Sequence, residues 1–291
     1  MARSAPGVIL FLALAVPAWL QSAVADTTAR KVAVSVLPLA SIVEAIGGDH
    51  VEVTVMVPPG TSPATFEPTP RQMAGLESSV LYVSMGLPRE QSWLSQIRAI
   101  HPDLPVLDLP AIVETRPIDR HGHGHGSEHE RPDPHIWLGP KQLRTAARAI
   151  RNALIRIAPR LAPDFAANAR DWLARLDAAD EIARERLGPH AGRAFLVFHP
   201  AFGYLADAYG LRQIPIEQRG MTPGPRMIAA AIEAARAEDI RVVFVQAQFS
   251  EDSARTIAAE IDGRVVRLDP LAADPIDTIL AATAAFDEAF R

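Results

Sequence analysis

The sequence of 291 residues contains no cysteine. That absence excludes disulfide bonds, thiolate metal ligands, cysteine nucleophiles and an N-terminal cysteine that could carry a lipid. The chain also lacks a basic excess, because 29 Lys and Arg stand against 34 Asp and Glu. This balance argues against a nucleic-acid-binding protein, which needs a basic face. The Gly-x-Ser-x-Gly pattern of one large hydrolase class is absent too.

Long hydrophobic runs are scarce, and the longest covers 14 residues from position 7 to position 20. About 20 apolar residues are needed to span a bilayer, so this run is too short for a membrane anchor. It follows Arg3 and precedes the small-x-small sequence Ala23-Val24-Ala25. A positive start, a short apolar run and small residues form the pattern of a cleavable secretory signal. We therefore expect a signal peptide over 1–25 and a mature protein in the periplasm.

What the chain does have is enough hydrophobic sequence for a core, at 48%. Strand-like and helix-like segments alternate along most of it. Apolar and β-branched runs predict strands near 31–37, 51–57, 80–83, 106–107, 194–198, 213–216, 242–246 and 265–268. Helical spacing predicts helices at 39–47, 70–77, 91–99, 204–209, 225–237, 253–261 and 275–290. Such alternation implies parallel sheets covered by helices on both faces.

The segment 140–187 differs, because it has helical spacing throughout and no strand-like run. Pro159 and Pro163 divide it into a helix that ends near 157 and a long helix over 164–187. The sequence thus predicts an α/β protein of two lobes, each a mostly parallel sheet flanked by helices. We expect an N-terminal lobe over 26–160, a linking helix over 161–188 and a C-terminal lobe over 189–291. No sequence repeat relates the two lobes.

A low-complexity insert, RHGHGHGSEHER, occupies residues 120–131. Alternating His and Gly cannot form a packed core, so this stretch is expected to be a loop. Neutral imidazoles on such a loop can capture Zn²⁺ or a related ion weakly, and we favour that role. The alternative is a solvated linker whose histidines are incidental. Its histidines are His121, His123, His125 and His129.

Three residues with ligand chemistry lie where predicted strands or the insert end. His199 follows the strand at 194–198, Asp269 follows the strand at 265–268, and His135 comes just after the insert. Ligands of open α/β sheets bind at the carboxyl ends of strands. Two imidazoles and a carboxylate suit Zn²⁺ better than Mg²⁺ or Ca²⁺. Each residue alone is equally consistent with a hydrogen-bonding or turn-capping role.

Five segments together resemble a known family. They are 59–70 (PGTSPATFEPTP), 133–138 (DPHIWL), 198–204 (FHPAFGY), 243–250 (VFVQAQFS) and 268–271 (LDPL). Their order and spacing are similar to those of the substrate-binding proteins of zinc and manganese ABC importers, the ZnuA/TroA type or cluster A-I. The match extends over nearly the whole mature chain. Zinc-type members carry a histidine-rich insert at the same place.

The resemblance implies a fold, a site and a partner. It implies two α/β lobes joined by a rigid helix, with a divalent metal in the cleft between them. It assigns metal ligation to His135, His199 and Asp269. Zn²⁺ is the implied cargo, with Mn²⁺ as the alternative, and the implied partner is the membrane permease of an ABC importer. A monomer without enzymatic activity is expected.

One position departs from the family pattern. The first ligand of the family is the histidine of Gly-x-x-Pro-His-x-x-Glu-Pro, and here that position is Ala64, which has no donor atom. A water molecule could complete the usual four ligands of zinc. Glu67 could swing in, although the family's glutamate supports the loop, or a histidine of the insert could bind. A fourth outcome is that the site has lost its metal.

Other residues are candidates for supporting or shielding this cleft. Gln246 and Gln248 are candidates for support by hydrogen bonding. Glu217 and Arg219 are further candidates, although a solvated loop position is the commoner explanation for such residues. Shielding is expected of Phe66, Trp137, Phe202 and Tyr204. An open zinc site also suits a hydrolase, with Glu67 as the one candidate base. A receptor for a non-metal ligand, or a metal chaperone without an importer, is the remaining alternative.

Overall fold

A computed structural model describes residues 29–118, 132–217 and 222–291. The first lobe contains a four-stranded sheet whose strands are all parallel, in the order β2-β1-β3-β4. The expected signal peptide, the histidine-rich insert and Arg219 lie outside the described residues. The elements of this lobe are β1 (Arg30–Val34), α1 (Leu37–Gly47), β2 (Val51–Val55), α2 (Pro70–Gly75), β3 (Leu81–Ser84), α3 (Glu90–Ile100) and β4 (Val106–Asp108).

The second lobe repeats the strand order of the first. Its four parallel strands are arranged β6-β5-β7-β8. In both sheets the second strand of the lobe is therefore followed by the first, the third and the fourth. The topology is therefore duplicated although no sequence repeat is visible. The elements are β5 (Ala194–Val197), α6 (Gly203–Tyr209), β6 (Arg212–Pro215), α7 (Pro225–Ala237), β7 (Val242–Val245), α8 (Asp252–Glu260), β8 (Arg264–Arg267) and α9 (Pro275–Phe290).

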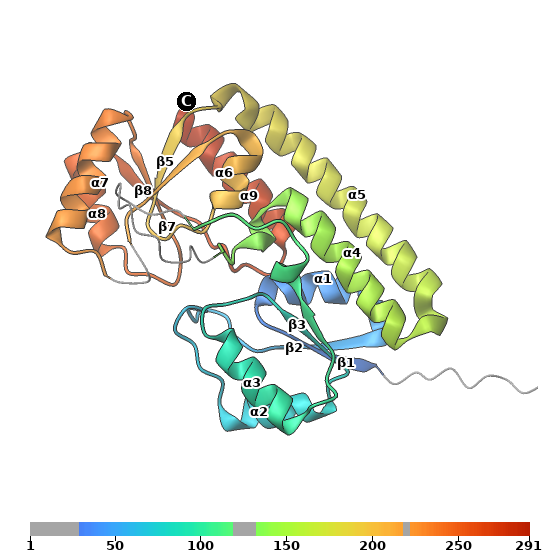
Figure 1. Ribbon diagram of the computed structural model, residues 1–291. Helices are drawn as coiled ribbons and strands as arrows, with labels where there is room; N and C mark the ends of the chain where they lie inside the picture. The colour runs from blue at the N-terminus through green and yellow to red at the C-terminus, as the bar shows by residue number, and fades with distance from the viewer. Residues whose placement is uncertain (1–28, 119–131, 218–221) are drawn as a thin grey trace, which may run out of the picture.

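Two long helices, α4 (Pro140–Ile157) and α5 (Ala162–Leu187), connect the lobes. Each has a proline in its first turn, where a missing N–H costs nothing. The 26 residues of α5 contact α1 and α4 on the side of the first lobe and α9 on the side of the second. Figure 1 shows α5 running beside α4 along the right-hand side of the molecule, from the second lobe to the first. This confirms the predicted architecture of two parallel-sheet lobes with a long helix between them.

The hydrophobic core is continuous across the two lobes. One cluster of buried side chains runs from the first sheet through α4 and α5 to α9 and one face of the second sheet. Side chains alternate along β7, so Phe244 belongs to this cluster while Val243 and Val245 belong to a second one under α7 and α8. The lobes are thus joined by packing as well as by the chain.

The element boundaries differ from the prediction mainly at one proline. Pro38 was expected to follow the first strand, but the strand ends at Val34 and α1 begins at Leu37 with Pro38 in its first turn. Proline is accepted there because its φ angle already suits a helix. None of the helices within the described residues combines the length and apolar character needed to cross a membrane.

The described residues that flank the histidine-rich insert are paired with each other, and we call this pairing the neck. Pro117 and Pro132 form an isolated antiparallel bridge. The N–H of Asp133 donates to the carbonyl of Arg116 at 2.7 Å. The neck therefore joins the two segments that flank the insert, immediately before the segment that carries His135.

Candidate metal centre

The first histidine of the centre, His135, is held by the aspartate two residues before it. Nδ1 of His135 donates to Oδ1 of Asp133 at 2.6 Å, and the backbone N–H of His135 donates to the same oxygen at 3.0 Å. The side chain of Asp133 is fully buried. An aspartate that accepts from the residue two positions later forms a familiar local turn. This role of Asp133 was not predicted, although the Asp-x-His spacing is typical of such a turn.

The second histidine, His199, lies two residues after the end of β5 and is held in the same way. Its Nδ1 donates to Oε1 of Glu217, which is buried after the neighbouring strand β6. Gln246, at the end of β7, donates to the carbonyl of His199 at 2.7 Å and accepts from its N–H at 3.0 Å. Glu217 and Gln246, both candidates for supporting the cleft, thus form hydrogen bonds with His199.

The ring nitrogens that are not bonded to a carboxylate, Nε2 of each imidazole, face each other. Nε2 of His135 lies 3.2 Å from Nε2 of His199. Because an ionised carboxylate can only accept, each Nδ1 carries a proton, and in the neutral form of each ring Nε2 presents the lone pair that binds a metal. A zinc ion bound tetrahedrally at about 2.1 Å from two nitrogens holds them about 3.4 Å apart, so the spacing already suits one metal ion.

Both imidazoles are largely buried, and burial favours the neutral form of His199. The side chains of His135 and His199 are 9% and 17% exposed. Burial lowers the pKa of His199 below its usual value of 6.5, while the hydrogen bond from its ring to Glu217 acts in the opposite direction. A neutral imidazole at physiological pH is the form that binds metal.

The third expected ligand, Asp269, lies on a loop that is hydrogen-bonded to the segment of His135 and to Gln248 after β7. Its Oδ1 accepts from Gln248 Nε2 at 2.9 Å and from the N–H of Leu271 at 3.0 Å. Next to it, the carbonyl of Pro270 accepts from Trp137 Nε1 at 2.6 Å. The described residues contain no group of three or more His, Asp or Glu side chains that could hold a metal as they stand. Ligation by Asp269 is therefore a proposal that needs a local adjustment.

The auxiliary candidate Glu67 is engaged by other side chains. Glu67 forms an ion pair with Arg89 and accepts from Trp93 Nε1 at 3.2 Å. A movement of the Glu67 side chain toward a metal would break both contacts. The four histidines of the insert lie outside the described residues.

The aromatic surroundings differ from expectation. Of the four residues expected to shield the site, Trp137 alone has a ring contact with a histidine of the pair, at 5.2 Å from His135. Phe66 packs edge-on against Trp93, and Phe202 packs in the core against Phe286. Instead, Phe249 stacks on His199 at 5.3 Å between ring centroids. Phe249 was not anticipated, because nothing in the sequence distinguishes it from a core residue.

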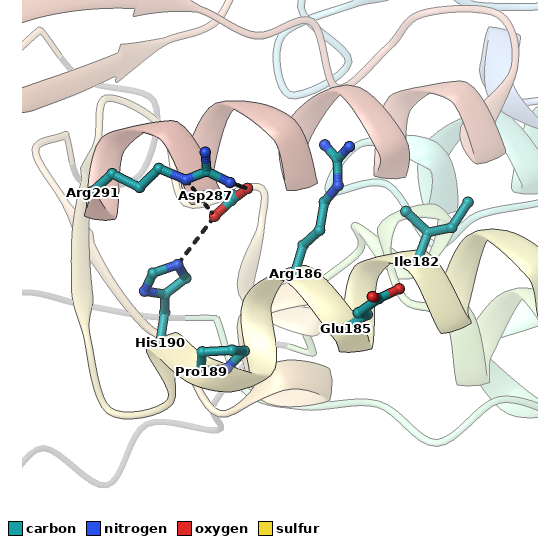
Figure 2. Close-up of a pocket in the computed structure, with 7 residues that line it drawn as sticks. All are labelled: Ile182, Glu185, Arg186, Pro189, His190, Asp287 and Arg291. Atoms are coloured by element: carbon teal, nitrogen blue, oxygen red, sulfur yellow. Dashed lines mark hydrogen bonds and ion pairs between the residues drawn. The ribbon is translucent and has the colours of Figure 1, made fainter.

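A hollow of about 520 Å³ lies elsewhere, between the carboxyl ends of α5 and α9 (Figure 2). Its charged groups are largely paired: His190 and Arg291 both bond to Asp287, at 3.2 and 2.7 Å. It contains none of the expected ligands, so it is not the metal centre. The lining residues are Ile182, Glu185, Arg186, Pro189, His190, Asp287 and Arg291.

Known proteins share this architecture. A family model described as "Zinc-uptake complex component A periplasmic" matches residues 32–283. A crystal structure of ZnuA is similar at a TM-score of 0.84 and 34% identity, covering 91% of this chain and 100% of that one. An internal-deletion mutant of ZnuA with zinc bound is similar at a TM-score of 0.81 and 35% identity, covering 90% and 98%.

A relative with a zinc-binding name matches over part of its own length. The zinc-binding protein AdcA of Streptococcus pyogenes serotype M3 is 26% identical over 259 residues, which is 83% of this chain and 50% of AdcA. This chain therefore spans about half the length of AdcA.

Proposed function

The chain belongs to the ZnuA family of metal-binding transport proteins, and on that basis we propose that it is a periplasmic receptor for a divalent metal, foremost Zn²⁺. It captures the ion at His135 and His199 and delivers it to the permease of an ABC importer. Members of this family are transport proteins and not enzymes. The hydrolase alternative also loses its only candidate base, because Glu67 is engaged by Arg89 and Trp93.

The observation that supports the proposal best is the paired imidazoles. Two nearly buried Nε2 atoms 3.2 Å apart, each backed by a carboxylate on Nδ1, form the arrangement that zinc sites use. Without a cation between them, two facing lone pairs repel each other. Nitrogen ligands favour Zn²⁺, while the oxygen ligand Asp269 leaves Mn²⁺ as the second candidate cargo.

The ligand set is completed by one carboxylate and one open position. We propose Asp269 as the third ligand, since the loop that carries it is hydrogen-bonded to Trp137 beside His135. Ala64 supplies no donor at the position of the family's first histidine. A water molecule fills the fourth position most simply, because Glu67 is tied to Arg89 and Trp93. A histidine of the insert is the competing donor.

The direct experiment is metal titration of the purified mature protein, which we expect to behave as a monomer. The wild type should bind one equivalent of Zn²⁺ more tightly than Mn²⁺, measured by competition with a chromophoric chelator. The double variant His135→Ala/His199→Ala should lose that equivalent. His101→Ala is the matched control, since His101 ends α3 away from the pair. Equal binding by wild type and double variant would contradict the proposal.

A deletion of residues 120–131 identifies the fourth donor. Tight binding that survives the deletion indicates water or a nearby carboxylate. Tight binding that disappears indicates a histidine of the insert. If neither protein binds tightly, Ala64 has disabled the site and a non-metal ligand becomes the leading alternative.

Export is the second part of the proposal. The pattern of residues 1–25 supports cleavage after Ala25. N-terminal sequencing of protein recovered from the periplasmic fraction should begin at Asp26. Recovery of the uncleaved chain with the cytoplasmic fraction would overturn this part alone.

A further inference from the structure

One arginine joins the two segments that carry the histidines. The side chain of Arg116 is 16% exposed. Its Nη1 donates to Oδ2 of Asp133 at 3.2 Å, and its Nε donates to Oδ2 of Asp207 at 2.7 Å. Asp133 holds the ring of His135, whereas Asp207 belongs to α6, the helix that follows His199. The guanidinium therefore bridges both sides of the metal centre.

Backbone and phenol groups reinforce this bridge. The hydroxyl of Tyr204 donates to the carbonyl of Asp133 at 2.7 Å, and the N–H of Arg116 donates to the same hydroxyl at 3.3 Å. Asp133 also donates its N–H to the carbonyl of Arg116. Every polar atom of Asp133 thus has a partner, and Oδ1 is turned toward His135 while Oδ2 is turned toward Arg116.

Gly203 provides the space for the guanidinium. A Cβ atom at this position would lie 1.9 Å from Nη1 of Arg116 and 3.0 Å from Oδ2 of Asp133. Gly203 starts α6 and has no left-handed φ angle, so it is needed for space and not for backbone conformation. An alanine would fit the helix but would displace the arginine.

We propose that Arg116 is a positioning residue for metal binding: with Asp133, Gly203, Tyr204 and Asp207 it forms an interlobe clasp that sets the spacing of the two imidazoles. This inference rests on the proposed function. A planar guanidinium can address two carboxylates at once with fixed geometry, which a lysine ammonium on a flexible stem cannot. The clasp explains why two imidazoles from different lobes are held at a separation that suits one metal ion.

Loss of Arg116 should loosen the centre without touching a ligand. Oδ2 of the fully buried Asp133 would lose the donor it has in Nη1. The carboxylate could then rotate, and the ring of His135 would no longer have one fixed orientation. Removing an outer partner of a metal ligand commonly lowers metal affinity about 10- to 100-fold.

The experiment compares variants by zinc affinity and by the visible absorption spectrum of the Co²⁺-loaded protein, which reports ligand geometry. Arg116→Gln should lower the zinc affinity about 10-fold or more and alter the Co²⁺ spectrum. Arg116→Lys should recover part of the loss. Arg175→Gln, which breaks an exposed ion pair with Asp274, is the control and should change neither readout.

A double-mutant cycle tests the clasp independently of the arginine's charge. Gly203→Ala should weaken zinc binding as much as Arg116→Ala does, and the double variant should be no weaker than either. Gly188→Ala is the matched control, because a Cβ there would meet nothing within 4 Å. If the Arg116 variants do not fold, the comparison of Gly203→Ala with Gly188→Ala alone keeps the test decisive.

The outcomes separate the two proposals. A wild type that binds no metal overturns the proposed function, and the positioning role falls with it. A wild type that binds zinc, with folded Arg116 and Gly203 variants within 2-fold of it and an unchanged Co²⁺ spectrum, overturns the clasp alone. Additive effects of Arg116→Ala and Gly203→Ala also overturn the clasp, since they would then act separately.

Discussion

At the scale of single residues, the centre is defined by its supporting carboxylates. His135 and His199 could be selected from the sequence because they follow a marked motif and a strand. Their partners could not be assigned in the same way. Glu217 lies 18 residues after His199, and only the pairing of β5 with β6 brings them together. Asp133 lies two positions before His135 in the sequence, but its role depends on which way the ring of His135 points.

The supporting carboxylates should matter for affinity although they do not touch the metal. In Asp133→Asn or Glu217→Gln the new amide can donate where the imidazole Nδ1–H also donates, so the ring loses its fixed tautomer and orientation. We expect zinc affinity to fall about 10- to 100-fold in each variant, measured by chelator competition. The exposed Asp171→Asn is the control. Unchanged affinity in both variants would show that the pairs are only structural.

Protonation of His199 gives a pH dependence with a defined sign. Burial lowers the pKa of His199 below 6.5 in the folded protein. As the pH falls below about 6.5, the unfolded chain takes up a proton there before the folded chain does. The contribution of His199 to the free energy of unfolding should therefore be constant above about pH 6.5. It should decrease as the pH falls from there through the pKa of His199 in the folded protein.

Urea unfolding at several pH values between about 8 and 5 measures this dependence. The difference in free energy of unfolding between wild type and His199→Gln isolates the contribution of the one histidine. That difference should shrink toward acidic pH. If the wild type instead gained stability relative to the variant on acidification, the folded pKa would be raised and not lowered.

At the scale of elements, a buried glutamate organises the loop between β3 and α3. Oε1 of Glu90 accepts from the hydroxyls of Ser35 and Tyr82, and Oε2 accepts from the N–H groups of Met85 and Leu87. Glu90 is 0% exposed and starts α3, where a negative charge is also favoured by the helix dipole. Four hydrogen-bond donors therefore stabilise this buried carboxylate, and none of the four is a cation.

Glu90→Gln tests this arrangement. The amide group of glutamine would place donors against two existing donors, so we expect a loss of about 2–4 kcal/mol in the free energy of unfolding. Urea unfolding monitored by tryptophan fluorescence measures it, with the exposed Glu77→Gln as control. A change no larger than that of the control would mean that the loop is held by its backbone alone.

Most elements were predictable because their periodicity is local. The strands β3 and β7 and the helices α4, α7 and α9 follow directly from apolar spacing and from prolines at their starts. The beginning of α1 was missed, since a strand-like Val-Ser-Val-Leu run continues into it without a break in hydrophobicity. The contact of Phe249 with His199 depends on tertiary packing, which no local pattern encodes.

At the scale of the whole molecule, the continuous core restricts how far the lobes can separate. The buried cluster that includes α1, α4, α5 and α9 would have to be broken for a wide hinge opening. Metal binding should therefore involve loop movements, in particular of the loop that carries Asp269. We expect the radius of gyration from small-angle X-ray scattering to change by less than about 0.5 Å on saturation with Zn²⁺. A decrease larger than about 1 Å would indicate a true hinge.

The neck formed by Pro117 and Pro132 also makes this protein suitable for engineering as a sensor. These two residues are already bridged, so the free energy of closing a loop between them grows only slowly with the length of the loop, by about 0.6 kcal/mol for each doubling. A fluorescent reporter domain with adjacent termini could replace residues 120–131 there without disturbing either sheet. Because the neck leads within three residues to His135, such a fusion would place the reporter directly beside the metal centre.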